Sequence, residues 1–484
     1  MLKRGLAFTA LCIMLLGGLL PSSCADARHW SASLDRVIGD GAGGAITLYA
    51  VMKGANRRDF YVQRISPAGE KMWGANGTLV GTADKGSVAA SNVRMVTDGS
   101  SGAIIVQTNS GYAVGKRTIT LSRVDSSGKL VWQRDSAPVD RIVADGQGGA
   151  IAAWVAGTTI SLNRFDSMGR PLWGESGTAI DRPSYGSNSL ELADDGDGGA
   201  IIAWLETDPA RARAGQPVTT EEVHAQRIDA DGRMAWGNGG ITLYVSPEDA
   251  AASWLRIARD EDGNAFLAWQ QYATVTIESG SPQGLLFGVR LQKLDPAGAG
   301  MWEPNGVMLR PDESAGPGNA PPMAPEVLGD GAGGAIVTWQ LVRPGEEGVY
   351  AQKVAADGSV LWQAGGVKTL SLPVGVANSV YTMSDGTGGV IVATNFYDLL
   401  PRQRGVRMLR LDAEGNTAWV IEPVNVSVDV TLGTFTAVSD GQGGVLLAWA
   451  TRKTDMSDAE VSFVQRIDSN GELLWGHEGI RLSD

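Results

Sequence analysis

The chain has 484 residues, of which 43% are hydrophobic and 19% charged, a globular and not a disordered composition. Its 65 glycines are about twice the usual share and predict many tight turns, as in an all-β fold with short strands. The net charge of −13 disfavours nucleic-acid binding, because an acidic surface repels the phosphate backbone.

The N-terminal segment has the features of an export signal. Two basic residues, Lys3 and Arg4, precede an apolar run from Leu6 to Leu20, which is too short for a typical transmembrane helix. Small residues then lead to Cys24. This arrangement resembles a bacterial lipoprotein signal, in which the cysteine is lipidated and becomes the mature N-terminus.

We therefore assign residues 1–23 to a lipoprotein-type signal peptide and residues 24–29 to a short tether, with lipidation expected at Cys24. The resemblance implies a cell-envelope protein, in the outer membrane, whose membrane contact is through the lipid alone. The alternative is ordinary secretion to the periplasm or the exterior, with cleavage after Ala25 or Ala27. Since the other cysteine is Cys12, residues 30–484 contain no disulfide and no thiolate metal site.

One hairpin motif occurs eight times in residues 30–484. A basic residue is followed five positions later by glycine, and a tryptophan follows that glycine by four positions. The basic residues are Arg64, Arg123, Arg164, Arg227, Lys293, Lys353, Arg410 and Arg466. The tryptophans are Trp73, Trp132, Trp173, Trp236, Trp302, Trp362, Trp419 and Trp475. The spacing predicts a strand, a turn with glycine at positive φ, and a second strand that carries the tryptophan.

A second motif, D-G-x-G-G-A followed by an apolar strand, alternates with the first. It begins at Asp40, Asp98, Asp145, Asp195, Asp330, Asp385 and Asp440, with a degenerate copy at Asp260. The strands that follow are continuously apolar, which indicates burial on both faces. The period averages about 57 residues, which fits a four-stranded propeller blade. We therefore predict an all-β, eight-bladed β-propeller over residues 30–484, with the apolar strand near the axis.

Two candidate sites follow from the repeats. Asp194, Asp195 and Asp197 form the most carboxylate-rich D-G-x-G-G turn, followed by residues 260–262, so they are the best candidates for calcium. Most copies offer one carboxylate, which fits a turn capped by aspartate. The repeated basic residues could bind an anion, but a residue present in every blade is better explained by pairing with a turn aspartate or stacking on a tryptophan.

The segments "DGQGGAIAAW" and "AQRIDADGRMAWGNGG" resemble repeats of secreted bacterial proteins that are described as propeller-like, and the resemblance covers residues 30–484. Quinoprotein-type propeller repeats, including those of an outer-membrane assembly lipoprotein, are distantly similar, as are sialidase Asp-boxes. These resemblances imply the architecture and no particular activity.

The sequence favours binding over catalysis. Three scattered histidines and no nucleophile or metalloprotease motif give no enzyme signature. Repeats differ most in the connections at 207–222, 270–287 and 451–462, which should emerge on one rim, whereas 312–324 should lie elsewhere. We expect a non-catalytic envelope or secreted propeller, without a cofactor other than calcium, that binds a protein or glycan through these loops. The alternative is a carbohydrate-active hydrolase or lyase with its site at the channel mouth.

Overall fold

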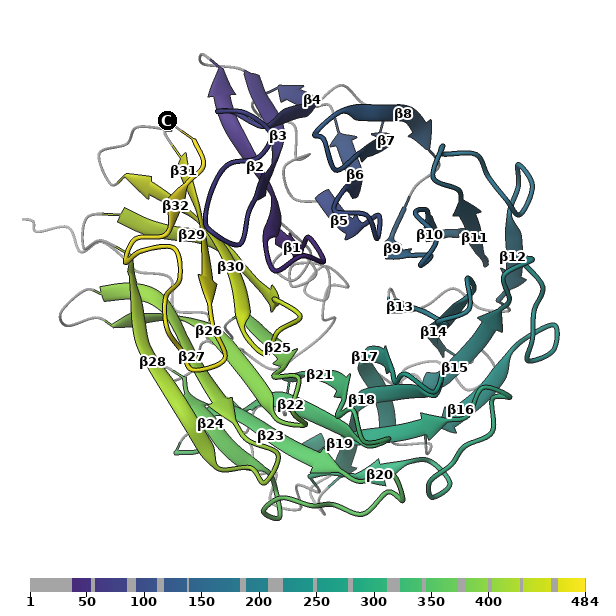
Figure 1. Cartoon of the computed structure of the whole chain (residues 1–484). Coiled ribbons are helices and arrows are strands. Elements are labelled where there is room, and N and C mark those ends of the chain that lie inside the picture. Colours follow the sequence, from purple (N-terminus) through teal and green to yellow (C-terminus); the bar gives the residue numbers. More distant parts are fainter. Residues whose placement is uncertain are drawn as a thin grey trace, which may run out of the picture.

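The computed structural model describes residues 37–483 with internal gaps at 54–56, 85–92, 111–116, 137–138, 183–188, 208–220, 247–249, 277–281, 311–322, 342–344, 373–378, 399–402, 427–429 and 454–459. In this part of the chain, β-strands form eight four-stranded antiparallel sheets. The sheets stand as blades around a central opening (Figure 1). The predicted all-β, eight-bladed propeller is confirmed. The signal peptide, Cys24 and the tether lie outside the described residues.

Each blade consists of four strands that are consecutive in the chain. Blades 1 and 2 contain β1 (Val37–Gly39), β2 (Ala45–Lys53), β3 (Arg57–Ile65), β4 (Thr78–Asp84), β5 (Val93–Thr97), β6 (Ala103–Ser110), β7 (Arg117–Val124) and β8 (Leu130–Ser136). Blades 3 and 4 contain β9 (Arg141–Ala144), β10 (Ala150–Ala156), β11 (Thr159–Phe165), β12 (Thr178–Asp181), β13 (Leu190–Asp194), β14 (Ala200–Thr207), β15 (Glu221–Ile228) and β16 (Ile241–Val245). Blades 5 and 6 contain β17 (Ala250–Arg259), β18 (Ala265–Thr276), β19 (Pro282–Leu294), β20 (Val307–Met308), β21 (Met323–Gly329), β22 (Ala335–Leu341), β23 (Gly348–Val354) and β24 (Val367–Ser371). Blades 7 and 8 contain β25 (Val380–Ser384), β26 (Val390–Asp398), β27 (Gln403–Leu411), β28 (Thr417–Val426), β29 (Val430–Ser439), β30 (Val445–Lys453), β31 (Glu460–Ile467) and β32 (Ile480–Arg481).

The strand nearest the axis is the first strand of each blade. The first strands of neighbouring blades contact one another around the ring, and they border the central opening (Figure 1). The expectation that the apolar strand after the D-G-x-G-G turn lies nearest the axis is therefore wrong, because that strand is the second in its sheet. The second position in the sheet explains the apolar composition of this strand equally well, because a neighbouring blade covers each of its two faces.

The second strands are buried on both faces, as predicted. In β10, Ala150 and Ala152 pack toward blade 2 whereas Ile151 and Ala153 pack toward blade 4. All four side chains have no exposed surface. The hydrophobic core is accordingly divided into eight clusters, one for each interface between neighbouring blades, and the eighth joins the last blade to the first.

The repeated tryptophans hold neighbouring blades together. The indole N–H of each donates a hydrogen bond to a backbone carbonyl in the third-to-fourth-strand turn of the next blade. The eight acceptors, at 2.9–3.1 Å, are the carbonyls of Ser126, Ser167, Ala230, Pro296, Ala356, Ala413, Ser469 and, across the seam from Trp475, Pro67. The repeated glycine of the same turn lies against this ring. A Cβ on Gly128 would come within 2.5 Å of Trp73 Cγ, and the φ of +84° adds strain for any other residue.

The tryptophan lies on the fourth strand in two blades only, as Trp132 in β8 and Trp419 in β28. In the other six blades, the predicted strand position is wrong because glycines interrupt the strand after the tryptophan. In blade 1, Gly74 and Gly77 both have positive φ, and the Gln63 amide bonds the Gly74 carbonyl and the Trp73 N–H. Blades 2 and 7 lack both this Gln or Asn side chain and the glycine after tryptophan.

Connections of different kinds share one rim of the ring. Because all strands are antiparallel, the first-to-second and third-to-fourth turns lie at one end of each blade, which we call the turn rim. Second-to-third connections and the links between blades leave their strands at the opposite end, which we call the loop rim. The connections predicted at 207–222, 270–287 and 451–462 all join a second strand to a third strand and so leave their strands at one rim, as predicted. The prediction that 270–287 is a loop is wrong for most of its length, because β18 extends to Thr276 and β19 begins at Pro282. The link between β20 and β21 also leaves β20 at this rim. Residues 312–322 lie outside the described residues, however, so the expectation that segment 312–324 lies elsewhere stays a prediction.

Candidate functional site

All eight repeated basic residues pair with the aspartate of the D-G-x-G-G turn in their own blade, as the sequence predicts. The six arginine pairs have N–O distances of 2.8–3.0 Å and the two lysine pairs of 3.5 Å. The pairs are Arg64–Asp40, Arg123–Asp98, Arg164–Asp145, Arg227–Asp195, Lys293–Asp260, Lys353–Asp330, Arg410–Asp385 and Arg466–Asp440. The aspartate side chains are at most 5% exposed.

The turn aspartates are fully engaged within their blades. In blade 3, Oδ1 of Asp145 accepts hydrogen bonds from the N–H groups of Gln147 and Gly149, and Oδ2 accepts from Arg164 Nε. Six of the eight basic residues also donate to a backbone carbonyl of a following blade, as Arg123 does to Ser167 at 2.9 Å. The repeated basic residues therefore hold turns and blades together.

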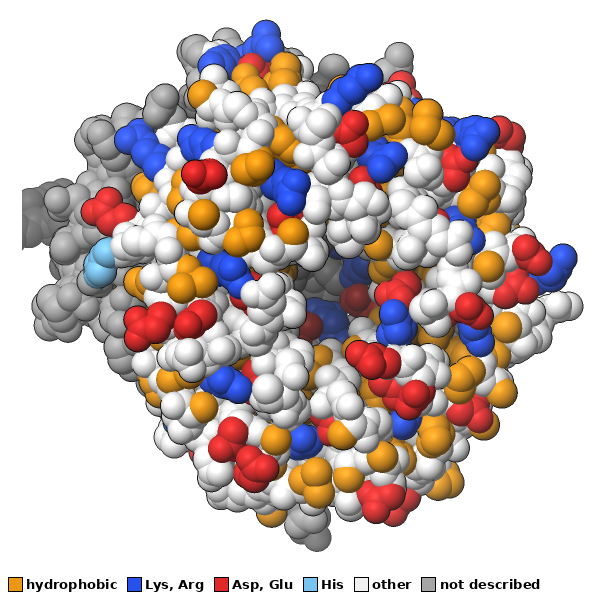
Figure 2. All heavy atoms as spheres, viewed as in Figure 1, with side chains coloured by type: hydrophobic (Ala, Val, Ile, Leu, Met, Phe, Trp, Pro, Cys, Tyr) orange, Lys and Arg blue, Asp and Glu red, His pale blue; other side chains and the backbone are white. Residues whose placement is uncertain are grey.

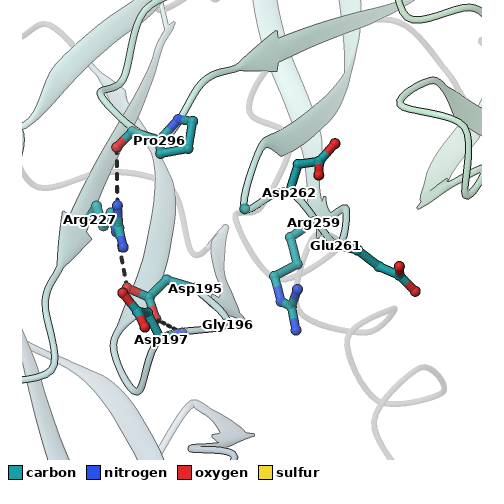
Figure 3. A pocket seen from close by; sticks show the side chains of 9 residues that line it. Asp195, Gly196, Asp197, Arg227, Arg259, Glu261, Asp262 and Pro296 are labelled. Atoms are coloured by element: carbon teal, nitrogen blue, oxygen red, sulfur yellow. Dashed lines mark hydrogen bonds and ion pairs between the residues drawn. The ribbon is translucent and has the colours of Figure 1, made fainter.

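The two turns singled out for calcium lie at one pocket on the turn rim between blades 4 and 5. Its volume is about 560 Å³. Figure 3 shows Asp195, Asp197 and Arg227 on one wall and Arg259, Glu261 and Asp262 on the other. The sequence could not show that these turns face each other, because they are separated by a whole repeat.

The contacts at this pocket give calcium binding no support. Asp195 bonds the Asp197 N–H and pairs with Arg227, and Asp194 pairs with Arg259 at 2.6 Å. Among the described residues, no group of three or more His, Cys, Asp or Glu side chains is placed to hold a metal ion. A calcium site at Asp194, Asp195 and Asp197 stays a prediction of the sequence.

A different set of charged side chains converges at the axis. They occupy one equivalent position, four residues before the turn aspartate, on the first strands of blades 2 to 6. The residues are Arg94, Arg141, Glu191, Arg256 and Glu326. Figure 2 shows the central hollow with basic and acidic side chains inside it. The equivalent residues of blades 7 and 8 are Tyr381 and Thr436, and that of blade 1, Arg36, lies outside the described residues.

Four of these side chains form a continuous ion-pair chain across blades 3 to 6, which we call the channel network. Arg141 binds both oxygens of Glu191, with Nη2–Oε1 at 2.9 Å and Nε–Oε2 at 3.2 Å. Arg256 binds Glu191 Oε1 through Nη1 at 3.2 Å and Glu326 Oε1 through Nε at 3.0 Å. Each contact joins inner strands of neighbouring blades.

The two glutamates of the channel network differ in electrostatic environment. Burial alone would raise the pKa of Glu191, but the Arg141 and Arg256 guanidinium groups together lower it. Burial also raises the pKa of Glu326, and there the attraction of Arg256 is too weak to reverse the shift. Glu191 is therefore held ionised, whereas ionised Glu326 is disfavoured by the fold.

We expect Glu191→Gln and Glu326→Gln to change stability in opposite directions at about pH 7. Because the pKa of Glu191 is lowered, its charge stabilises the fold above the unfolded-state pKa, and Glu191→Gln should lower the unfolding free energy. Because the pKa of Glu326 is raised, its ionisation costs stability as the pH rises, and Glu326→Gln should preserve or increase the unfolding free energy. Urea denaturation at neutral and acid pH measures both. The difference caused by Glu326→Gln should disappear below about pH 4, the ordinary glutamate range, whereas the difference caused by Glu191→Gln should persist to lower pH and be lost only as the pH falls through the lowered pKa of Glu191. A loss of equal size in the two variants would contradict the assignment.

Comparison with known proteins adds little beyond the fold. No protein-family model matches the chain, and no curated protein matches it. Among solved structures, the β-propeller domain of the Trilobed protease from Pyrococcus furiosus is similar at 9% identity and a TM-score of 0.38, covering 80% of this chain and 96% of that one. A Hadza microbial sialidase matches at 13% identity and 0.37, covering 82% of this chain and 73% of that one. A eukaryotic initiation factor matches at 8% identity and 0.39, covering 86% and 94%.

Proposed function

We propose that this chain is an exported, non-catalytic propeller of the cell envelope that binds a protein or a glycan at the loop rim. The observation that carries the proposal is the contrast between the two rims. At the turn rim, the repeated charges and tryptophans are used in contacts within and between blades. Connections of very different length leave the strands at the loop rim, from two residues between β10 and β11 to thirteen between β14 and β15. Variable loops on a rigid scaffold are where binding surfaces concentrate.

The envelope location is part of the proposal and rests on the expected lipoprotein-type signal peptide, residues 1–23, that precedes Cys24. A lipid on this residue would tether the propeller to the outer membrane, with no other membrane contact. Within the described residues, no helical segment has the length and apolarity that crossing a bilayer requires.

Affinity capture from envelope extracts tests the binding proposal. The bait is the full chain, compared with a variant in which residues 208–220 are replaced by a short Gly-Ser linker, and with Arg170→Ser, an exposed change on the turn rim. The loop variant should lose the captured protein or glycan, whereas Arg170→Ser should retain it. Equal capture by all three would exclude this loop. Cys24→Ala in the same cells should move the protein from the membrane fraction to the soluble fraction.

The channel network favours a second candidate, a carbohydrate-active hydrolase or lyase with its site at the channel mouth. An enzyme at this place needs convergent carboxylates from different blades, and Glu191 and Glu326 both contact one arginine. Two carboxyls whose pKa values move apart are typical of acid–base catalysis, although structural ion-pair networks produce the same pattern. Release of reducing ends from envelope glycans, abolished in both glutamine variants, would establish this activity.

A further inference from the structure

The channel network is not required to close the ring. The Asp–basic pair and the tryptophan contact occur in every blade, so they contribute to the packing of every blade. The position four residues before the turn aspartate is charged in blades 2 to 6, yet blades 7 and 8 hold their places with Tyr381 and Thr436. Tyr381 binds the Phe435 carbonyl across that interface at 2.7 Å. Blade packing therefore does not require charge at this position.

The charge in the channel opposes that of the rest of the chain. Among the described residues at this position, three arginines face two glutamates, whereas the whole chain carries −13. All three arginines lower the pKa of Glu191, so their positive charges act at one place. A channel with this excess concentrates anions in an otherwise acidic protein.

Arg256 keeps donor capacity toward the channel, whereas every side-chain nitrogen of Arg141 already donates one hydrogen bond. The side chains of Arg141 and Arg256 are 16% and 15% exposed. Arg256 uses Nε and Nη1 in its contacts with Glu326, Glu191 and the Leu255 carbonyl. Within the described part of the chain, its Nη2 has no acceptor. A guanidinium edge of this kind matches the oxygens of a carboxylate or a phosphate.

We propose that the central channel binds a small oxyanion-bearing ligand through the guanidinium groups of Arg141 and Arg256, with Arg94 adding positive potential. Glu326, the more exposed carboxylate at 32%, lies beside Arg256 and accepts a hydrogen bond from a hydroxyl of the ligand. This combination favours a hydroxylated carboxylic acid, such as a uronic acid, over inorganic phosphate. The site is separate from the loops of the proposed function, but it shares Arg256 and Glu326 with the second candidate function.

Isothermal titration calorimetry of the full chain with sodium glucuronate, inorganic phosphate and uncharged glucose tests the proposal. Glucuronate should bind with one site per chain and more tightly than phosphate, and glucose should not bind. Arg256→Gln should weaken glucuronate binding roughly tenfold or more, because a charged hydrogen bond is lost. Glu326→Gln should strengthen it, because a negative charge beside Arg256 is removed while an acceptor oxygen remains. The matched control is Arg310→Gln, which breaks the Arg310–Glu346 pair beside the outermost strand of blade 5 and should leave binding unchanged.

The variants are compared only where thermal unfolding shows that they are folded. Glu326→Gln keeps the proposal testable if Arg256→Gln does not fold, because both arginines are retained. Absence of binding by glucuronate and phosphate to the folded wild type would overturn the proposal. Weaker binding in Glu326→Gln, or an equal loss in Arg310→Gln, would overturn it as well. Tighter binding of phosphate than of glucuronate would overturn the preference for a hydroxylated acid.

Discussion

Replacing Arg164 with alanine should lower the free energy of unfolding by about 3–5 kcal/mol, because it leaves a buried carboxylate without its counter-charge. Among the eight basic–aspartate pairs, Arg164–Asp145 is among the most buried, with side chains 6% and 1% exposed. The two N–H groups that Asp145 Oδ1 also accepts cannot replace the lost positive charge. Urea denaturation followed by tryptophan fluorescence measures the change.

The matched control is Arg170→Ala in the same blade. Arg170 pairs with Asp166 at 2.7 Å, but its side chain is 76% exposed. Exposed ion pairs contribute about 1 kcal/mol or less, so this variant should remain close to wild type. Arg164→Lys should lie between the two alanine variants, since blades 5 and 6 use lysine at 3.5 Å. If both alanine variants lost the same stability, the buried pair would not be the cause.

The basic–aspartate pair could be predicted from the sequence because both partners recur once in every repeat. Arg227 lies on β15 opposite Ile201 at the start of β14, and Asp195 lies in the turn that leads into β14, so the partner is determined by the geometry of one blade. If the recurrent basic residue were unpaired, each of the eight blades would contain a buried charge without a partner. The pairing could therefore be predicted from the repeat period and the charges of the two side chains, without knowing how neighbouring blades are arranged.

The partner of each tryptophan could not be predicted in the same way. A period of about 57 residues fits a contact within a blade and a contact with the next blade equally well. The structure shows that Trp73 reaches Ser126 in the next blade and lies on Gly128. The glycine that the sequence assigned to turn geometry thus has a second role, since its missing Cβ makes room for the neighbouring indole.

The channel network was missed because its residues differ from blade to blade. Arg141, Glu191, Arg256 and Glu326 share only their distance from the turn aspartate, and a search for recurrent residues passes over them. Aligning the repeats on that aspartate would have found a column in which most residues are charged, with both signs present. Recognising this column as the lining of a channel would still have required knowing which strand is innermost. That strand was predicted wrongly, because an apolar composition fits a first strand and a second strand equally well.

Replacing Trp475 with alanine should open the ring at its seam as well as lower the free energy of unfolding by about 3–5 kcal/mol, the usual cost of removing a buried tryptophan. Trp475 packs between the last and first blades beside Tyr49 and Leu446, and its N–H binds the Pro67 carbonyl. Among the described residues, each sheet contains strands of one blade only. Within the described part of the chain no strand pairing crosses the seam, which is held by side-chain packing and hydrogen bonds.

The matched control is Trp302→Ala, which removes the same contact between blades 5 and 6. Trp302 is 9% exposed and binds the Ala356 carbonyl at 2.9 Å, close to the values of Trp475. Blades 5 and 6 are joined by the chain itself, so their separation is limited by the link, whereas the first and last blades have no such link. Small-angle X-ray scattering below the unfolding transition should show a larger radius of gyration for Trp475→Ala and no change for Trp302→Ala. If both variants stayed equally compact, the remaining apolar contacts of the seam would be sufficient to keep the propeller closed.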